Sequence, residues 1–206
     1  MMSGYSGHTG IVVKGKAICV AGMDFPGNSL LQFNLVHQKR EQGYKPPFFF
    51  FITFVPAGKA GNSKTYITDK RVSFKVEYTK ALEIVAAIRA HANGGGGRLG
   101  KLVIWADPTK AAHVSENTDM RTGKRMTVDS APHARNQGEH VVRVTCDPGK
   151  DQSGASAPAI VYSMSPYEAL AIADNLSFLA QQAREMHFNR MVLDSRNAAA
   201  AGRMAA

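Results

Sequence analysis

Hydrophobic and polar positions alternate along residues 11–20 and again along residues 30–38. In the second stretch Leu31, Phe33 and Leu35 share one face, and the positions between them are mostly polar. A period of two is typical of strands that are buried on one side only. Proline, glycine and asparagine at positions 26–28 predict a turn between these two strands.

The next stretch, residues 48–55, is apolar at almost every position, which predicts a central strand covered on both faces by a helix and by another subunit. A polar loop at 57–64 leads to a fourth strand at 71–78. The apolar spacing then changes to i, i+3, i+4, i+7, which predicts a helix. Thr79 is placed to cap this helix, and Asn93 followed by four glycines ends it.

The second half of the chain repeats this plan. Alternation predicts strands at 101–106, 124–129, 140–146 and 159–164. Ser165-Pro166-Tyr167-Glu168 then forms a capping box with proline at the first helical position, and an apolar stripe follows as far as Met186. The alanine-rich tail at 187–206 is expected to fray, and residues 1–9 are expected to be flexible.

The predicted fold class is therefore α+β, with two four-stranded antiparallel sheets that are each followed by a helix (ββββα–ββββα). Residues 10–186 form a single domain in this interpretation. Two open sheets with one helix each leave long strand edges and one bare face, and oligomerisation is the usual remedy.

Composition agrees with a folded domain of this size. The 206 residues are 44% hydrophobic, and the most apolar stretch is far too short to span a bilayer. No secretory signal is visible at the start. Cys19 and Cys146 lie far apart on predicted strands, which favours buried free thiols in a reducing compartment. We therefore expect an intracellular protein, located in the cytoplasm if the host is bacterial or in an organelle.

The formal net charge of +9 indicates polyanionic partners, of which nucleic acid is the commonest. Enzymatic function is not favoured, because the seven histidines are dispersed and no HxxxH, CxxC, GxSxG or P-loop spacing occurs. The four glycines at 94–97 follow a helix instead of opening one, so they are a poor phosphate cradle. No cofactor, metal, membrane or small-molecule substrate is expected.

The chain resembles the Whirly family of single-stranded DNA-binding proteins. Lys14-Gly15-Lys16-Ala17-Ile18 is close to a Lys-Gly-Lys-Ala-Ala-Leu motif of that family, and Trp105-Ala106-Asp107-Pro108 is similar to its aromatic-Asp-Pro strand ending. The strand and helix start at 162–179 are also similar, and the resemblance covers about 10–186. Ala106 is inserted in the second motif, the loop from Asp107 to Arg125 differs, and the family's acidic, aromatic tail is absent.

The resemblance implies two roughly perpendicular four-stranded sheets, with the helices joining subunits into a tetramer. It also implies binding of single-stranded DNA along the sheets with little sequence preference. Related folds occur in guide-RNA-binding proteins and positive coactivators, so RNA binding or annealing is an alternative. An oligomeric structural protein without nucleic acid is a further alternative.

A sheet face that interleaves cations with flat side chains suits a single strand, whose phosphates lie outside and whose bases splay. The polar candidates for such a face are Lys14, Lys16, Gln32, Asn34, Lys39, Arg40, Lys45, Arg71 and Lys75. Each also has a plainer interpretation as a solvated side chain, and for Lys14 and Lys16 a third is a contact between oligomers.

Among the aromatic residues, the run at 48–51 places two rings on each side of its strand. One pair belongs to the core, and the other, which includes Phe49, either packs or stacks on bases. Trp105, the only tryptophan, shares a face with Lys101 and Val103, where it either stacks or packs.

Overall fold

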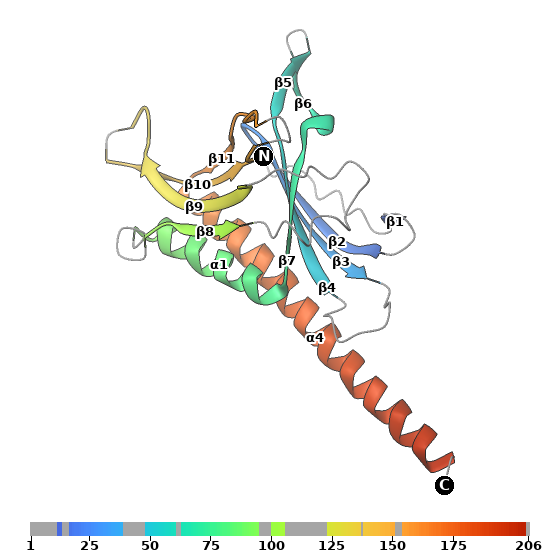
Figure 1. The fold of residues 1–206 in the computed structure, drawn as a ribbon. Helices are drawn as coiled ribbons and strands as arrows, with labels where there is room; N and C mark the ends of the chain where they lie inside the picture. The colour runs from blue at the N-terminus through green and yellow to red at the C-terminus, as the bar shows by residue number, and fades with distance from the viewer. Residues whose placement is uncertain are drawn as a thin grey trace.

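The computed structural model describes residues 12–13, 17–38, 48–60, 63–94, 100–105, 123–136, 138–150 and 154–204. These residues form two antiparallel sheets, a separate two-stranded ribbon and two long helices (Figure 1). The predicted α+β class with a helix after each sheet is confirmed.

The first sheet has five strands instead of the predicted four, in the order β1-β2-β3-β4-β7, because a short strand pairs with the start of β2. Its members are β1 (Val12–Val13), β2 (Ala17–Pro26), β3 (Leu30–Gln38), β4 (Phe48–Val55) and β7 (Val72–Val76). The strands β3 and β4 have the predicted bounds. The first predicted strand is wrong in its extent, because residues 20–26 continue β2 and pair with β3 as far as Pro26 and Leu30.

The predicted loop at 57–64 contains a two-stranded ribbon instead. Its strands are β5 (Ala57–Ala60) and β6 (Ser63–Tyr66), and the ribbon projects beyond the first sheet (Figure 1). At its base the amide of Ile67 donates to the carbonyl of Pro56 at 2.9 Å. Cross-strand pairing thus satisfies the backbone polar groups of a segment whose side-chain pattern shows no strand.

The second sheet has the order β11-β10-β9-β8 and corresponds to the four strands predicted in the second half. Its members are β8 (Leu102–Trp105), β9 (Arg125–Pro132), β10 (His140–Asp147) and β11 (Ile160–Met164). The strand β9 is longer than predicted, since it pairs with β10 along its whole length.

Both helices begin directly after a sheet. The first, α1 (Tyr78–Ala92), has Glu77 at its N-cap, so the predicted cap at Thr79 is wrong: the amide of Ala81 already donates to the carbonyl of Glu77 at 3.0 Å. The helix ends as expected at Asn93, followed by Gly94 with a φ of 74°.

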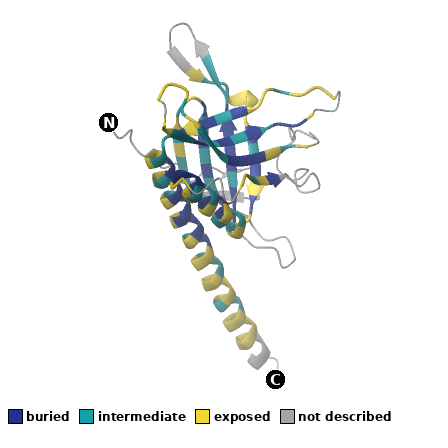
Figure 2. Cartoon of the chain, turned by 90° about the vertical axis from the view of Figure 1, so that its left-hand side faces the viewer, coloured by how far each residue is buried: buried dark blue, intermediate teal, exposed yellow. Residues whose placement is uncertain are grey.

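The second helix, α4 (Pro166–Met204), opens with the predicted capping box. The amide of Ser165 donates to Glu168 Oε2 at 2.8 Å, and the amide of Glu168 donates to Ser165 Oγ at 3.3 Å. The helix is continuous to Met204, well past the predicted end near Met186, and its last part extends away from the body (Figures 1 and 2).

One hydrophobic core joins both sheets and both helices. Its largest fully buried side chains come from β3, β4 and β7, with Phe33, Phe50, Phe54 and Phe74 among them. Cys146 is buried and not in a disulfide, as predicted, whereas the side chain of Cys19 lies outside the described part. No helix in the described part of the chain is long and apolar enough to span a membrane.

Candidate nucleic-acid interface

The first sheet has a second face, turned away from the core side chains. Strand alternation and register place Gln32, Asn34, Phe49, Phe51, Thr53, Ser73 and Lys75 on it. We call these residues the polar face of the first sheet. Four of the candidates from the sequence, namely Gln32, Asn34, Phe49 and Lys75, therefore lie on one surface although they come from three strands.

Cross-strand pairing arranges the polar face in rows. In the central row Asn34 of β3 is opposite Phe51 of β4, and Phe51 is opposite Lys75 of β7. Directly paired side chains on a sheet have Cβ atoms about 4.5–5.5 Å apart. An amide, an aromatic ring and an ammonium group therefore follow one another across three adjacent strands.

The neighbouring row is held by hydrogen bonds within the protein. Gln32 Nε2 donates to Asp24 Oδ1 at 2.9 Å, and the hydroxyls of Thr53 and Ser73 lie 2.8 Å apart. These bonds fix the orientation of the Gln32 amide and bind the edge strand β7 to β4. The polar side chains of this row are consequently held in fixed orientations beside the central row.

The two aromatic rings of this face have different exposure. Phe49 is buried, with 5% of its surface exposed, and Phe51 is half-buried. Their ring centroids are 5.1 Å apart in a T-shaped arrangement, and Lys75 Nζ lies 4.0 Å from the centroid of Phe49. Phe49 thus packs against Phe51 and lies under the ammonium group of Lys75, and Phe51 is the more exposed of the two rings.

Gly22 makes room for the amide of Asn34. Gly22 of β2 is opposite Asn34 in the register, and a Cβ at Gly22 would lie 2.5 Å from Asn34 Oδ1. Only glycine lets the amide extend over β2 at this distance. The strand alternation in the sequence identifies Asn34 but gives no sign of this close approach.

Arg71 lies immediately before β7 and is exposed. By alternation with Ser73 and Lys75 it continues the same side of the sheet. Lys70, also exposed, precedes it at the end of a short 3-10 helix (Thr68–Lys70). This end of the polar face therefore carries basic side chains, whereas the exposed acid Glu77 follows the opposite end of β7.

The remaining candidates lie outside the described residues or belong to the second sheet. Lys14, Lys16, Lys39, Arg40 and Lys45 lie outside the described residues. Trp105 belongs to β8 in the second sheet, where it is opposite Arg125 in the register, and its side chain is outside the described part.

The second sheet presents cations that are already paired with carboxylates. Arg143 donates to both oxygens of Asp129, at 2.9 and 3.2 Å, and Lys101 Nζ lies 3.7 Å from the same carboxylate. Arg125 is bonded to Asp147 at 3.1 Å. A phosphate would have to displace these carboxylates, so the first sheet is the better candidate surface. No group of three or more potential metal ligands is found among the described residues.

Comparison with known proteins gives structural similarity only. No protein-family model matches the sequence, and no curated protein matches it. The structure is similar to that of WHY1 from Arabidopsis thaliana, with 15% sequence identity and a TM-score of 0.45, over 97% of this chain and 95% of that one. It is also similar to the plant transcriptional regulator PBF-2, with 15% identity and a TM-score of 0.42, over 92% of this chain and 96% of that one. Both similarities extend over most of the chain, at low sequence identity.

Proposed function

We propose that this chain binds single-stranded DNA with little sequence preference through the polar face of the first sheet, without catalysing a reaction. The observation that carries the proposal is the row Asn34–Phe51–Lys75, in which a half-buried ring lies between an amide and an ammonium group. Each group matches one part of a single strand. Every base has a flat surface that stacks on a ring, and every nucleotide carries a phosphate.

In the proposed complex a base stacks on Phe51 while its neighbouring phosphate contacts Lys75, and Arg71 contacts a phosphate further along the strand. The amide of Asn34 hydrogen-bonds the edge of the stacked base. Stacking and phosphate contacts do not depend on base identity, which is the physical reason for the low sequence preference. The net charge of +9 favours association of the whole molecule with a polyanion.

We further propose that the chain acts as a homo-oligomer, a tetramer in the simplest case, and serves genome maintenance, recombination or transcription. Oligomerisation would align several polar faces on one long strand. Large aromatic side chains exposed on α4, Tyr167, Phe178 and Phe188, support an assembly formed through the helices.

The test is fluorescence anisotropy of a labelled oligothymidylate titrated with the protein at a series of salt concentrations. Affinity should fall linearly in log salt with a slope of about 0.7 per phosphate contact, and Lys75→Gln should lower that slope. Lys80→Gln, at a half-buried lysine of α1 that pairs with Glu83, is the matched control and should leave the slope unchanged.

The same titration with duplex DNA and with oligouridylate separates the alternatives. Tighter binding of oligouridylate would replace the DNA proposal by RNA binding. Equal affinity for duplex and single strand would contradict the stacking mechanism, and no binding at low salt would overturn the proposal as a whole.

A further inference from the structure

The ribbon β5–β6 is not explained by packing of the hydrophobic core. Its two strands form a sheet of their own, from Ala57 opposite Tyr66 to Ala60 opposite Ser63, and none of its described side chains belongs to the core. A two-stranded hairpin alone is at best marginally stable in water. The ribbon nevertheless projects beyond the first sheet (Figure 1), so we looked for a partner that its chemistry fits.

The base of the ribbon is fixed to the body of the protein. The hydroxyl of Tyr66 donates to the carbonyl of Gly27 at 3.3 Å, and the amide of Ile67 donates to the carbonyl of Pro56. A Cβ at Gly58 would lie 2.8 Å from Ile67 Cγ1, so Ile67 packs directly over the backbone of β5. The segment that leaves the ribbon then leads through the short 3-10 helix to the basic end of the polar face.

The sequence of the ribbon suits a polyanion. Lys59 and Lys64 are at opposite positions in the register, and residues 57–66 contain no acid. Like charges at directly opposite positions destabilise a strand pair, and a bound anion would relieve that repulsion. The other residues are small or polar, apart from Tyr66 at the base. The ribbon therefore offers cations but, unlike the polar face, no free ring on which a base could stack.

We propose that the ribbon β5–β6 enters the major groove of duplex DNA next to the single strand on the polar face, so that the chain binds the junction between single-stranded and duplex DNA. This inference rests on the proposed function and adds a second site to it. In the complex the single strand runs along the polar face toward Arg71. The first base pairs of the duplex lie against the ribbon, where Lys59 and Lys64 contact its phosphates.

The dimensions of the ribbon agree with this groove. Paired strands lie about 4.8 Å apart, and at about 3.4 Å per residue β5 is about 10 Å long from Ala57 to Ala60. The major groove of B-DNA is about 12 Å wide and about 8.5 Å deep, and it admits a two-stranded ribbon. The ribbon is therefore long enough to reach the base edges. The minor groove, about 6 Å wide, is too narrow for two strands with their side chains.

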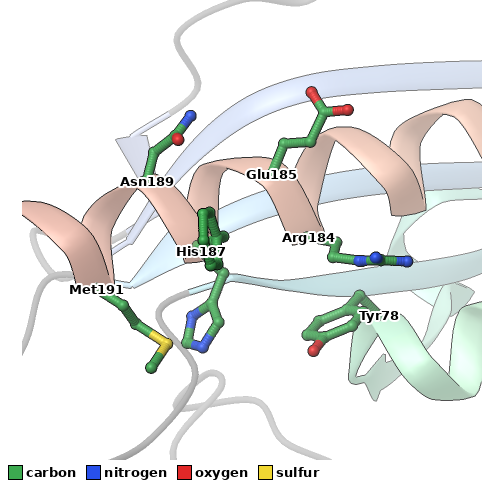
Figure 3. Close-up of a pocket in the computed structure, with 7 residues that line it drawn as sticks. Tyr78, Arg184, Glu185, His187, Asn189 and Met191 are labelled. Atoms are coloured by element: carbon green, nitrogen blue, oxygen red, sulfur yellow. The ribbon is translucent and has the colours of Figure 1, made fainter.

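A cavity between the two helices is a poorer candidate for a second nucleic-acid site. It has a volume of about 670 Å³ and is lined by Tyr78, Arg184 and Glu185 among others (Figure 3). An acid and a base both line it, and its lining residues all come from α1 and α4. The ribbon, by contrast, is followed in the chain by the basic end of the polar face, so one nucleic acid can contact both.

The test compares the affinity for a labelled oligothymidylate with the affinity for the same oligothymidylate as a tail on a duplex, with tails of both polarities. The wild type should bind the better tailed duplex about tenfold more tightly than the free tail, with a log-salt slope steeper by about 0.9 for each lysine at a duplex phosphate. Lys59→Gln combined with Lys64→Gln should remove this preference and leave the affinity for the free tail unchanged. Lys80→Gln combined with Lys101→Gln is the control, because it removes the same charge from two lysines that each pair with a carboxylate outside the ribbon. The control should keep the preference.

A second variant tests the ribbon itself, and chemical protection identifies the groove. Replacing residues 59–64 by Asn-Gly, which favours a tight two-residue turn, shortens the ribbon and should also remove the preference. Binding of the free tail checks that the polar face of this variant is intact. Guanine N7 lies in the major groove and adenine N3 in the minor groove. The wild type should protect guanine N7 from dimethyl sulfate in the duplex next to the tail, and neither ribbon variant should.

The outcomes separate this inference from the proposed function. A wild type that binds the tailed duplex no more tightly than the free tail overturns the ribbon site alone, and so do ribbon variants that keep the preference. Ribbon variants that lose as much affinity for the free tail as for the tailed duplex also overturn it, because the ribbon would then contact the single strand. Protection of adenine N3 in place of guanine N7 contradicts the major groove. A wild type that does not bind the free tail overturns the proposed function and the junction together.

Discussion

The side chain of Asn28, in the turn between β2 and β3, is hydrogen-bonded to the main chain of Ser163 in β11. It is also bonded to the main chain of Val161, so its two partners lie on either side of Tyr162. The amide of Ser163 donates to Asn28 Oδ1 at 3.2 Å, and Asn28 Nδ2 donates to the carbonyl of Val161 at 2.8 Å. Asn28 thus acts as one residue of an additional strand. It joins the two sheets and occupies backbone groups on the open edge of β11.

Replacing Asn28 should therefore destabilise the whole fold. Asn28→Ala removes both bonds, although the carbonyl of Val161 still accepts from Ser29 Oγ at 3.0 Å, and we expect a loss of about 0.5–1.5 kcal/mol in the free energy of unfolding. Urea denaturation followed by circular dichroism measures it. Thr65→Ala, at an exposed position of β6, should change stability by less than about 0.5 kcal/mol. Equal stabilities of the two variants would show that the hydrogen bonds between Asn28 and β11 contribute nothing to the free energy of unfolding.

The two helix starts differ in what their side chains contribute. Ser165→Ala removes the two hydrogen bonds of the Ser165 hydroxyl, which donates to the Glu168 carboxylate and accepts from the Glu168 amide, and should cost about 0.5–2 kcal/mol of unfolding free energy. Thr79→Ala should cost less, because α1 begins at Tyr78 with Glu77 at its N-cap, so Thr79 already lies inside the helix. Thermal unfolding of both variants under the same conditions measures which one loses more stability. A larger loss of stability for Thr79→Ala would contradict this prediction.

Local pattern was sufficient for most elements, since alternation in β3 and the unbroken apolar run in β4 depend on neighbouring residues alone. The capping box of α4 is likewise local. The hydrogen bonds between Asn28 and β11 join positions far apart in the chain, so no local sequence pattern predicts them. The ribbon β5–β6 was missed because its strands carry glycine, alanine and lysine, which pair through the backbone without an apolar face.

The candidate site was predictable to a similar degree. Alternation assigns Gln32, Asn34 and Lys75 to one side of their strands, but register decides that they share a surface. The sequence also places Phe49 and Phe51 on the same face, but it does not indicate which of the two rings is more exposed. Their difference in exposure arises from packing on the folded sheet, where Phe49 packs against Phe51 and lies under the ammonium group of Lys75.

Stability should decrease in mild acid because of His37. Burial lowers the pKa of His37 below its usual value, and the nearby Arg190 lowers the pKa further. A histidine with a lowered native pKa binds protons more weakly in the folded than in the unfolded state. Its contribution is therefore fully present above the unfolded pKa of about 6.5 and is lost as pH falls from there toward the native pKa.

The measurement for His37 is the free energy of unfolding by urea at several pH values between about 7.5 and 5. His37→Gln removes the titrating group and should reduce the slope of stability against pH in this interval. An unchanged slope would assign the acid sensitivity to other groups.

Phe51 and Phe49 should separate binding from stability. Phe51 is half-buried on the polar face, so Phe51→Ala should weaken oligothymidylate binding by about 1–3 kcal/mol, the value of one base stack. Phe49 is buried beside it, so Phe49→Ala creates a cavity and should cost about 3–5 kcal/mol of unfolding free energy. Phe49→Leu keeps most of the volume and should bind nearly as the wild type does. If Phe49→Leu lost affinity as Phe51→Ala does, the stacking role would belong to the buried ring and the proposed division between the two would be wrong.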